Sequence, residues 1–144
     1  MSQHLNNINN TSNTIKNLIE CAFNAQKLSY SPYSNFQVGA SLLCSDGSIF
    51  NGCNIENIAY SPTNCAERTA FFNAISQGNK SFSCIAIVGS PKGRAPTDYC
   101  YPCGVCRQVM AEFCTSDFKV IVAKSVDDYI IYSLSDFLPL SFNF

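Results

Sequence analysis

The sequence has almost no histidine, since His4 is the only one among 144 residues. One histidine near the N-terminus leaves no base for a hydrolase in which histidine activates Ser or Cys. It also removes the commonest nitrogen ligand for metals. Any chemistry carried out by this chain therefore has to depend on Cys, Glu, Asp or the backbone.

The chain also lacks an excess of positive charge and any long apolar run. Nine Lys and Arg residues against ten Asp and Glu residues give a formal net charge of -1, and the basic residues are scattered, whereas nucleic-acid binding requires clustered ones. No apolar stretch reaches the roughly 20 residues of a membrane span. Residues 1–13 are rich in Asn and Ser, unlike a secretory signal. We therefore expect a cytoplasmic protein that binds a small molecule and binds neither nucleic acid nor membrane.

Cysteine, in contrast, is abundant, with nine residues. The odd number and the lack of an export signal disfavour a disulfide scaffold and favour reduced thiols or metal ligands. Five cysteines lie in apolar patterns and are expected to be small buried residues. These are Cys21, Cys44, Cys53, Cys84 and Cys114.

The hydrophobic pattern predicts one domain of the α/β class. Residues 1–13 have no periodicity and are expected to form a loose tail, whereas residues 14–144 are expected to form the domain. The predicted helices begin at Thr14, Cys65 and Gly104, and the predicted strands are Phe36–Leu42, Ile49–Cys53, Phe82–Gly89, Lys119–Ala123 and Tyr129–Leu134. This order indicates a mixed sheet with helices on its faces.

Two short motifs carry the candidate chemistry, Cys65-Ala66-Glu67 and Pro102-Cys103-Gly104-Val105-Cys106. Each opens a predicted helix, where unpaired backbone N–H groups and the helix dipole favour a thiolate. Two converging helix ends would gather three thiolates around one cation, for which zinc is the usual choice. Because three protein ligands leave the fourth zinc position to water, Glu67 is placed to move protons beside the metal.

Cys100 leaves a structural alternative open. Cys100, Cys103 and Cys106 form overlapping C-x-x-C pairs, and together with Cys65 they could make a closed four-thiolate zinc site without catalysis. The presence of Glu67 favours the catalytic site with three ligands, in which Cys100 is a loop thiol.

Taken in order, the motifs resemble the cytidine deaminase family in its small homotetrameric form, which binds zinc through three cysteines. The resemblance extends from about Ser31 to Phe142. It is carried by residues 31–40, 52–57, 65–70, 102–108 and 138–142. It implies a single-domain, three-layer α/β/α fold with a mixed five-stranded sheet. It also implies zinc-dependent hydrolysis of cytidine and deoxycytidine to uridine and deoxyuridine with release of ammonia, a step of pyrimidine salvage.

The resemblance assigns residues to the metal site. Cys65, Cys103 and Cys106 match the ligands of one Zn²⁺ ion per subunit, and Glu67 matches the residue that transfers protons. Arg68 matches a residue that donates to the thiolates. This role has a physical reason, because zinc with three thiolates has a net charge of -1, which would raise the pKa of bound water.

The resemblance also assigns substrate contacts. Asn54 and Glu56 match a pair that binds the sugar, and alternate residues of an extended strand do point to one side. Phe36 matches an aromatic ring against the pyrimidine, and the backbone N–H of Ala66 matches a contact to the base. Phe142 matches a phenylalanine that enters the active site of a neighbouring subunit, so a homotetramer is expected.

Three other functions compete with this interpretation. Deamination of a base within RNA or DNA is disfavoured by the charge balance. A zinc-stabilised interaction module would require a fourth protein ligand. An enzyme that deaminates a nucleoside antibiotic would be expected to have other residues in place of the sugar-binding Asn-x-Glu pair. In this chain the pair is intact. The segment Ser90–Tyr101 is longer than in many family members and is interpreted as a surface loop in preference to an active-site lid.

Overall fold

The computed structural model describes the backbone of residues 2–142 and the side chains of residues 11–142. Its strands are β1 (Phe36–Cys44), β2 (Ile49–Cys53), β3 (Phe82–Pro91), β4 (Lys119–Ala123) and β5 (Tyr129–Ser133). They form one sheet in the order β2-β1-β3-β4-β5. The pair β3–β4 is parallel and the other pairs are antiparallel, so the predicted mixed five-stranded sheet is confirmed.

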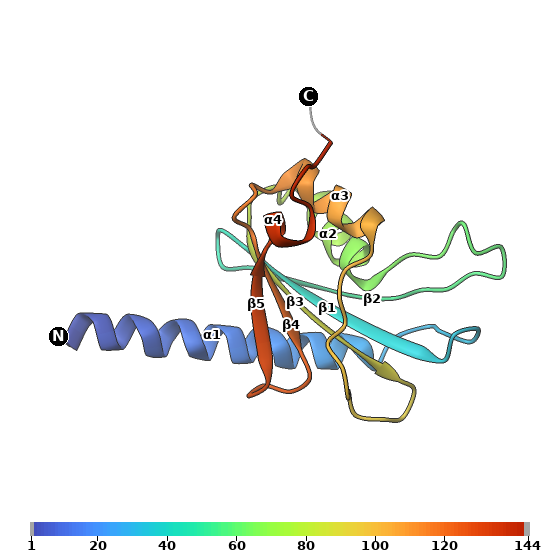
Figure 1. Ribbon diagram of the computed structural model, residues 1–144, viewed down its shortest axis with the longest axis horizontal. Coiled ribbons are helices and arrows are strands. Elements are labelled where there is room, and N and C mark those ends of the chain that lie inside the picture. The colour runs from blue at the N-terminus through green and yellow to red at the C-terminus, as the bar shows by residue number, and fades with distance from the viewer. Residues whose placement is uncertain (1, 143–144) are drawn as a thin grey trace.

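Helices cover both faces of this sheet (Figure 1). The helix α1 (Ser2–Gln26) lies on one face, and α2 (Ala66–Ser76), α3 (Gly104–Phe113) and the short α4 (Leu134–Phe137) lie on the other. The helix α4 ends two residues before Pro139, as a proline at that position requires. The three-layer α/β/α arrangement expected from the resemblance is therefore present.

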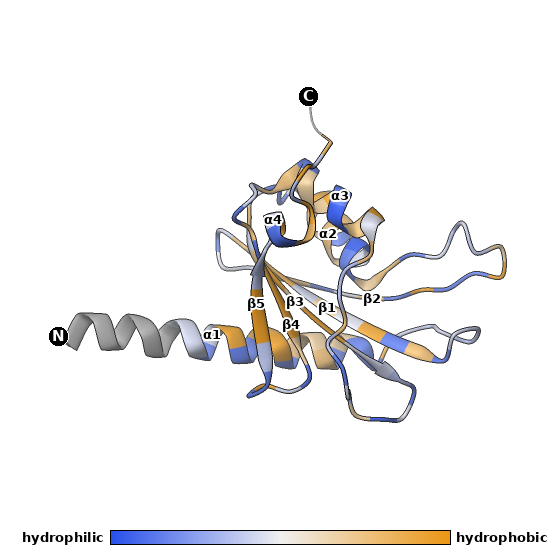
Figure 2. Ribbon diagram, in the orientation of Figure 1, coloured by the Kyte–Doolittle hydropathy of each residue, from blue (hydrophilic) through white to orange (hydrophobic). Residues whose placement is uncertain are grey.

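The central strands are apolar on both sides because each side packs against a helical layer. In β3, Ile85 and Ile87 belong to the core shared with α2 and α3, whereas Ala86 and Val88 belong to the core shared with α1. Such a doubly buried strand has a continuous apolar sequence without alternation, and Figure 2 shows the central strands mostly in the hydrophobic colour.

The N-terminal helix is longer than the sequence pattern indicates. Residues 1–13 were expected to be a loose tail, but α1 begins at Ser2 and its N-terminal part extends past the edge of the sheet (Figure 1). The segment from Ser2 to Gln26 contains neither Gly nor Pro, so nothing stops the helix there, although Asn and Ser are only moderate helix formers. Met1 lies outside the described residues.

A close approach between β2 and α2 sets the position of the predicted site. A Cβ atom at Gly52 would lie 2.4 Å from the Ala66 carbonyl oxygen and 2.4 Å from the Ala70 nitrogen. Only glycine allows the two backbones to come this close. The start of α2 is thereby held against the end of β2, where Asn54 and Glu56 follow.

Within the described residues, no helix is both long enough and apolar enough to cross a membrane.

Candidate active site

Two helix N-termini bring the three predicted ligand cysteines together. Cys65 is the N-cap residue of α2 and Cys103 is that of α3, while Cys106 lies in the first turn of α3. The sulfur of Cys103 is 3.8 Å from that of Cys65 and 3.6 Å from that of Cys106. All three sulfurs lie within 4.8 Å of one another. The donor type, number and mutual distance fit one zinc ion.

The surroundings of the cluster favour a thiolate at Cys65. A hydrogen bond from Cys106, assisted by Arg68 and Cys103, lowers the pKa of Cys65 to about 5. The same interaction raises the pKa of Cys106, which is buried and acts as the donor. Cys65 therefore forms a thiolate readily, which is the form that binds a metal.

Arg68 lies beside the cluster, as the resemblance implies. Its Nη2 atom donates to the sulfur of Cys65 at 3.4 Å and to the carbonyl oxygen of Thr63 at 3.3 Å. Its Nε atom is buried and has no hydrogen-bond partner among the described residues. A guanidinium fixed in this position offsets the negative charge that three thiolates would concentrate at the metal.

Cys100 is not a member of the sulfur cluster. It packs over β3, where a Cβ atom at Gly89 would lie 2.7 Å from its sulfur. Burial raises the pKa of Cys100 to about 12, and the sulfurs that lie within 4.8 Å of one another are those of Cys65, Cys103 and Cys106. The closed four-thiolate alternative is therefore not supported by the geometry.

Glu67 is the buried carboxyl group at this site. The residue is 4% exposed, and burial raises the pKa of its carboxyl group to about 7. It lines a cavity of about 170 Å³. The walls of this cavity include Asn54, Glu56, Cys65, Ala66, Glu67 and Cys103. A cavity that joins a buried carboxyl group to a set of metal ligands provides the elements of metal-assisted hydrolysis.

Asn54 and Glu56 are fixed in place by backbone and hydroxyl groups. The Asn54 side chain accepts a hydrogen bond from the Val38 N–H at 2.8 Å and donates to the Phe36 carbonyl at 2.9 Å. Both carboxylate oxygens of Glu56 accept hydrogen bonds from the segment that contains Ser34. The Ser34 hydroxyl is the main cause of the lowered pKa of Glu56. Both side chains are thus preorganised, and the carboxylate of Glu56 stays ionised.

The two predicted aromatic contacts lie outside the wall of this cavity in the single chain. The Phe36 ring packs over Gly89, next to Cys100, at the start of β1. Phe142 is 69% exposed, and its carbonyl oxygen accepts a hydrogen bond of 2.9 Å from Gln108 on α3. The C-terminal segment therefore runs along α3, close to the metal ligands of that helix.

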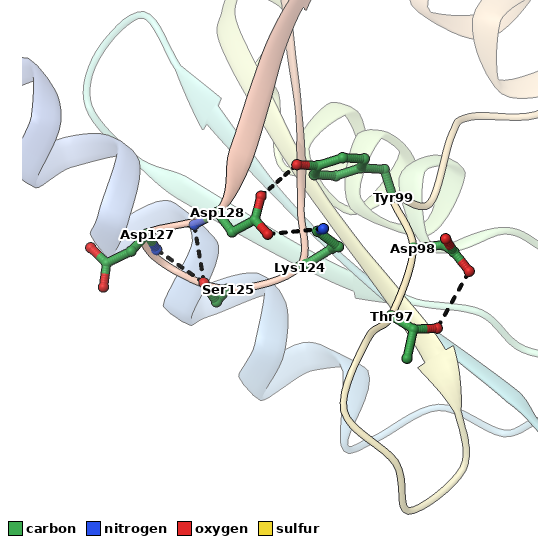
Figure 3. A network of polar contacts seen from close by, with 7 residues as sticks. All are labelled: Thr97, Asp98, Tyr99, Lys124, Ser125, Asp127 and Asp128. Atoms are coloured by element: carbon green, nitrogen blue, oxygen red, sulfur yellow. Dashed lines mark hydrogen bonds and ion pairs between the residues drawn. The ribbon is translucent and has the colours of Figure 1, made fainter.

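The segment before Cys103 is mostly exposed, and one of its anchors is a polar contact at Tyr99 (Figure 3). The hydroxyl of Tyr99 donates to the carboxylate of Asp128 in the β4–β5 connection. Lys124 lies 2.9 Å from the other oxygen of this carboxylate and 4.7 Å from the centre of the Tyr99 ring. This arrangement agrees with a surface loop. Sequence reasoning missed the anchor because its partners are 25 or more positions away from Tyr99 in the chain.

Comparison with known proteins shows the family. The model of the cytidine and deoxycytidylate deaminase zinc-binding region matches residues 12–123. The cytidine deaminase of Sporosarcina psychrophila is 46% identical over 129 residues, which are 90% of this chain and 91% of that protein. The cytidine deaminase of Halalkalibacterium halodurans is 48% identical over 125 residues, which are 87% and 91% of the two chains.

Solved structures agree with these matches. The crystal structure of cytidine deaminase from Burkholderia pseudomallei has a TM-score of 0.79 and 43% identity, and it covers 87% of this chain and 96% of its own. The fold and the thiol cluster define a zinc-dependent deaminase. The chain belongs to the cytidine and deoxycytidylate deaminase family. The predicted family, fold, enzyme class and zinc cofactor are thus confirmed.

Proposed function

We propose that this protein deaminates the free nucleosides cytidine and deoxycytidine to uridine and deoxyuridine, as a step of pyrimidine salvage. The observation that carries this proposal is the buried Glu67 carboxyl group, which lies in one cavity with Cys65, Cys103 and the Asn54–Glu56 pair. The cavity has room for a small ligand, and the chain has no excess of positive charge to hold a nucleic-acid strand.

Cys65, Cys103 and Cys106 would hold the metal, and Arg68 would balance their charge. When bound, zinc with three protein ligands lowers the pKa of a water molecule at its fourth position. The remaining chemistry belongs to the residues of the chain itself.

Glu67 would move the protons of the reaction. Its carboxylate would take a proton from the attacking water and deliver it to the N3 atom of the pyrimidine, so that C4 can accept the oxygen. It would then take the proton of the new C4 hydroxyl group and give it to the departing amino group, which leaves as ammonia. Its burial at the start of α2 keeps bulk water from competing for these protons.

Asn54 and Glu56 would bind the sugar. The Asn54 amide nitrogen has a second N–H beyond the one it donates to Phe36, and the Glu56 carboxylate has further lone pairs. Both groups can therefore add a hydrogen bond to a ribose hydroxyl without losing their present partners. The Ala66 backbone N–H at the start of α2 would contact the base. Phe36 lies next to Cys100, a residue of the cavity wall, and its ring would turn against the base when the substrate binds.

The active site would be completed by a second copy of the chain. Phe142 is exposed in the single chain and is not part of the cavity wall. In a homotetramer it would be available to close the cavity of a neighbour, adding an apolar wall that excludes water.

An ultraviolet assay tests the proposal. Purified zinc-loaded protein should convert cytidine and deoxycytidine with a fall in the absorbance of the cytosine ring, and pretreatment with a chelator should abolish the reaction. Cytosine and deoxycytidine monophosphate serve as comparison substrates. Faster conversion of either one than of both nucleosides would contradict the nucleoside assignment.

A further inference from the structure

Arg107 on α3 follows the ligand Cys106 directly and holds two chain segments at once. Its Nε atom donates to the Pro102 carbonyl oxygen at 2.7 Å, and its Nη1 atom donates to the Phe137 carbonyl oxygen at 3.0 Å. Its guanidinium carbon lies 5.1 Å from the centre of the Phe137 ring. The half-buried guanidinium therefore makes two hydrogen bonds and a cation–π contact with these two residues.

The two carbonyl groups belong to segments with different tasks. Pro102 is fully buried and immediately precedes the ligand Cys103. Phe137 is the last residue of α4, where a helix leaves carbonyl groups without partners in its own backbone. The planar guanidinium presents several N–H groups in fixed directions, so one side chain can reach both carbonyls, whereas a lysine ammonium is a compact point charge.

Other contacts hold the same C-terminal segment against the site. Gln108, the next residue of α3, donates to the Phe142 carbonyl oxygen at 2.9 Å. The Phe137 ring lies 5.9 Å from that of Tyr101, which lines the cavity, and 4.9 Å from that of Tyr132. Consecutive residues of α3 thus hold both ends of the segment from Phe137 to Phe142.

We infer that Arg107 is a positioning residue that ties the backbone before the ligand Cys103 to the C-terminal segment that carries Phe142. The Arg107 side chain thereby links the path of this segment to the helix that carries two of the metal ligands, in addition to the contact of the Phe137 ring with Tyr132 of β5. The consequence for substrate affinity rests on the proposed function, in which Phe142 closes a neighbouring active site. The mechanical link itself does not depend on the reaction.

The variant Arg107→Ala tests the link by two independent measurements on zinc-loaded full-length protein. The first is the rate at which carboxypeptidase removes residues down to Leu140, followed by mass spectrometry without substrate. It should rise about tenfold, because the segment loses its hydrogen bond to Arg107 and the cation–π contact at Phe137. The second is steady-state kinetics with cytidine, in which KM should rise about tenfold while kcat changes little. Zinc content should match that of the wild type.

Two further variants make the result specific. Arg107→Lys keeps the positive charge but cannot span both carbonyls, so its trimming rate should also rise. Lys80→Ala removes an exposed positive charge elsewhere and should leave trimming and KM unchanged. Wild-type trimming in Arg107→Ala or Arg107→Lys would overturn the inference, and so would loss of zinc from Arg107→Ala with trimming unchanged. Accelerated trimming in a protein that does not deaminate cytidine would uphold the link and refute the proposed function.

Discussion

The sulfur atoms of Cys65 and Cys103 lie 3.8 Å apart although the residues are 38 positions apart in the chain. They meet because α2 and α3 cover the same face of the sheet and begin at the same place, with β3 between them in sequence. Each cysteine takes the N-cap position with extended backbone and makes no side-chain cap hydrogen bond. Their sulfurs are therefore available to a metal.

Replacement of single cysteines distinguishes the zinc ligands from cysteines that only lie near the zinc site. Cys103→Ala should lose zinc and activity together and should lower the melting temperature, because metal binding is coupled to folding. Cys100→Ala is the matched control, since its thiol lies over Gly89 outside the cluster, and it should keep about one zinc ion per chain. Elemental analysis of the purified variants checks this. Equal loss of zinc from both variants would restore the closed four-thiolate site.

Glu67→Gln should retain zinc and the fold but lose about 100- to 10,000-fold in kcat, because a buried amide cannot take or give the protons of the reaction. Zinc content and the circular dichroism spectrum should match those of the wild type. The exposed Glu112 on α3 provides the control Glu112→Gln, which removes the same charge and should keep normal kcat. A Glu67→Gln variant with more than a tenth of wild-type kcat would contradict this role for Glu67.

The strands and helices could be predicted from the sequence wherever local pattern and turn chemistry act together. Both Ile49–Cys53 and Lys119–Ala123 occur as predicted, because their apolar runs end at turn signals. The predicted start of the first helix at Thr14 was wrong, because α1 begins at Ser2. Residues 2–13 have no apolar periodicity, and continuation of the helix there depends on the absence of Gly and Pro. Such continuation is a weak local effect that periodicity does not detect.

The candidate site was predictable only in part. The three cysteines and Glu67 stand in ordered motifs at helix starts, so residue type and position together indicated their place. Neither the double hydrogen bond of Arg107 nor the anchor of Tyr99 on Asp128 could be foreseen. The Phe137 partner of Arg107 lies in the C-terminal segment and the Asp128 partner of Tyr99 lies in the β4–β5 connection, and only tertiary packing brings these partners together.

Gly52→Ala should destabilise the protein by about 1–3 kcal/mol or more, because the added methyl group meets backbone atoms of α2 that cannot rotate away. The start of α2 carries Cys65, so zinc affinity should fall as well. Gly104→Ala is the control, since a Cβ atom there meets nothing within 4 Å. Chemical denaturation of the two zinc-loaded variants measures their stability, and titration with a chelator measures their zinc affinity. Equal stability of the two variants would show that α2 can move away from β2.

Glu56→Gln should raise KM for cytidine about tenfold or more while changing the rate with free cytosine little, because cytosine has no sugar to bind. The N–H groups of Tyr33 and Ser34, which both donate to Oε2, can still donate to the amide oxygen, and the Ser34 hydroxyl can accept from the amide nitrogen, so the fold should be kept. The exposed Glu20 on α1 gives the control Glu20→Gln, which should behave as the wild type. If Glu56→Gln weakens cytidine and cytosine equally, the residue does not bind the sugar.

Truncation after Leu140 tests whether the C-terminal segment acts within its own subunit or on a neighbour. Phe142 is 69% exposed, so little apolar area of the subunit's own core is lost with its side chain. If these residues only cover their own core, truncation should lower the melting temperature and leave KM normal in the protein that folds. If Phe142 closes a neighbouring cavity, truncation should raise KM and lower kcat at nearly normal zinc content, because water enters a site that has lost an apolar wall.

Mixing distinguishes the two cases further. Truncated chains with an intact Glu67 can be combined with full-length Glu67→Gln chains, which supply Phe142 but cannot move protons. Mixed oligomers should then recover part of the activity that neither parent has, since each competent cavity receives Phe142 from its neighbour. Sedimentation at the assay concentration should show a species of four chains for the wild type. A fully active monomer in that measurement, or mixtures with no more activity than the sum of the parents, would show that each subunit works with its own residues alone.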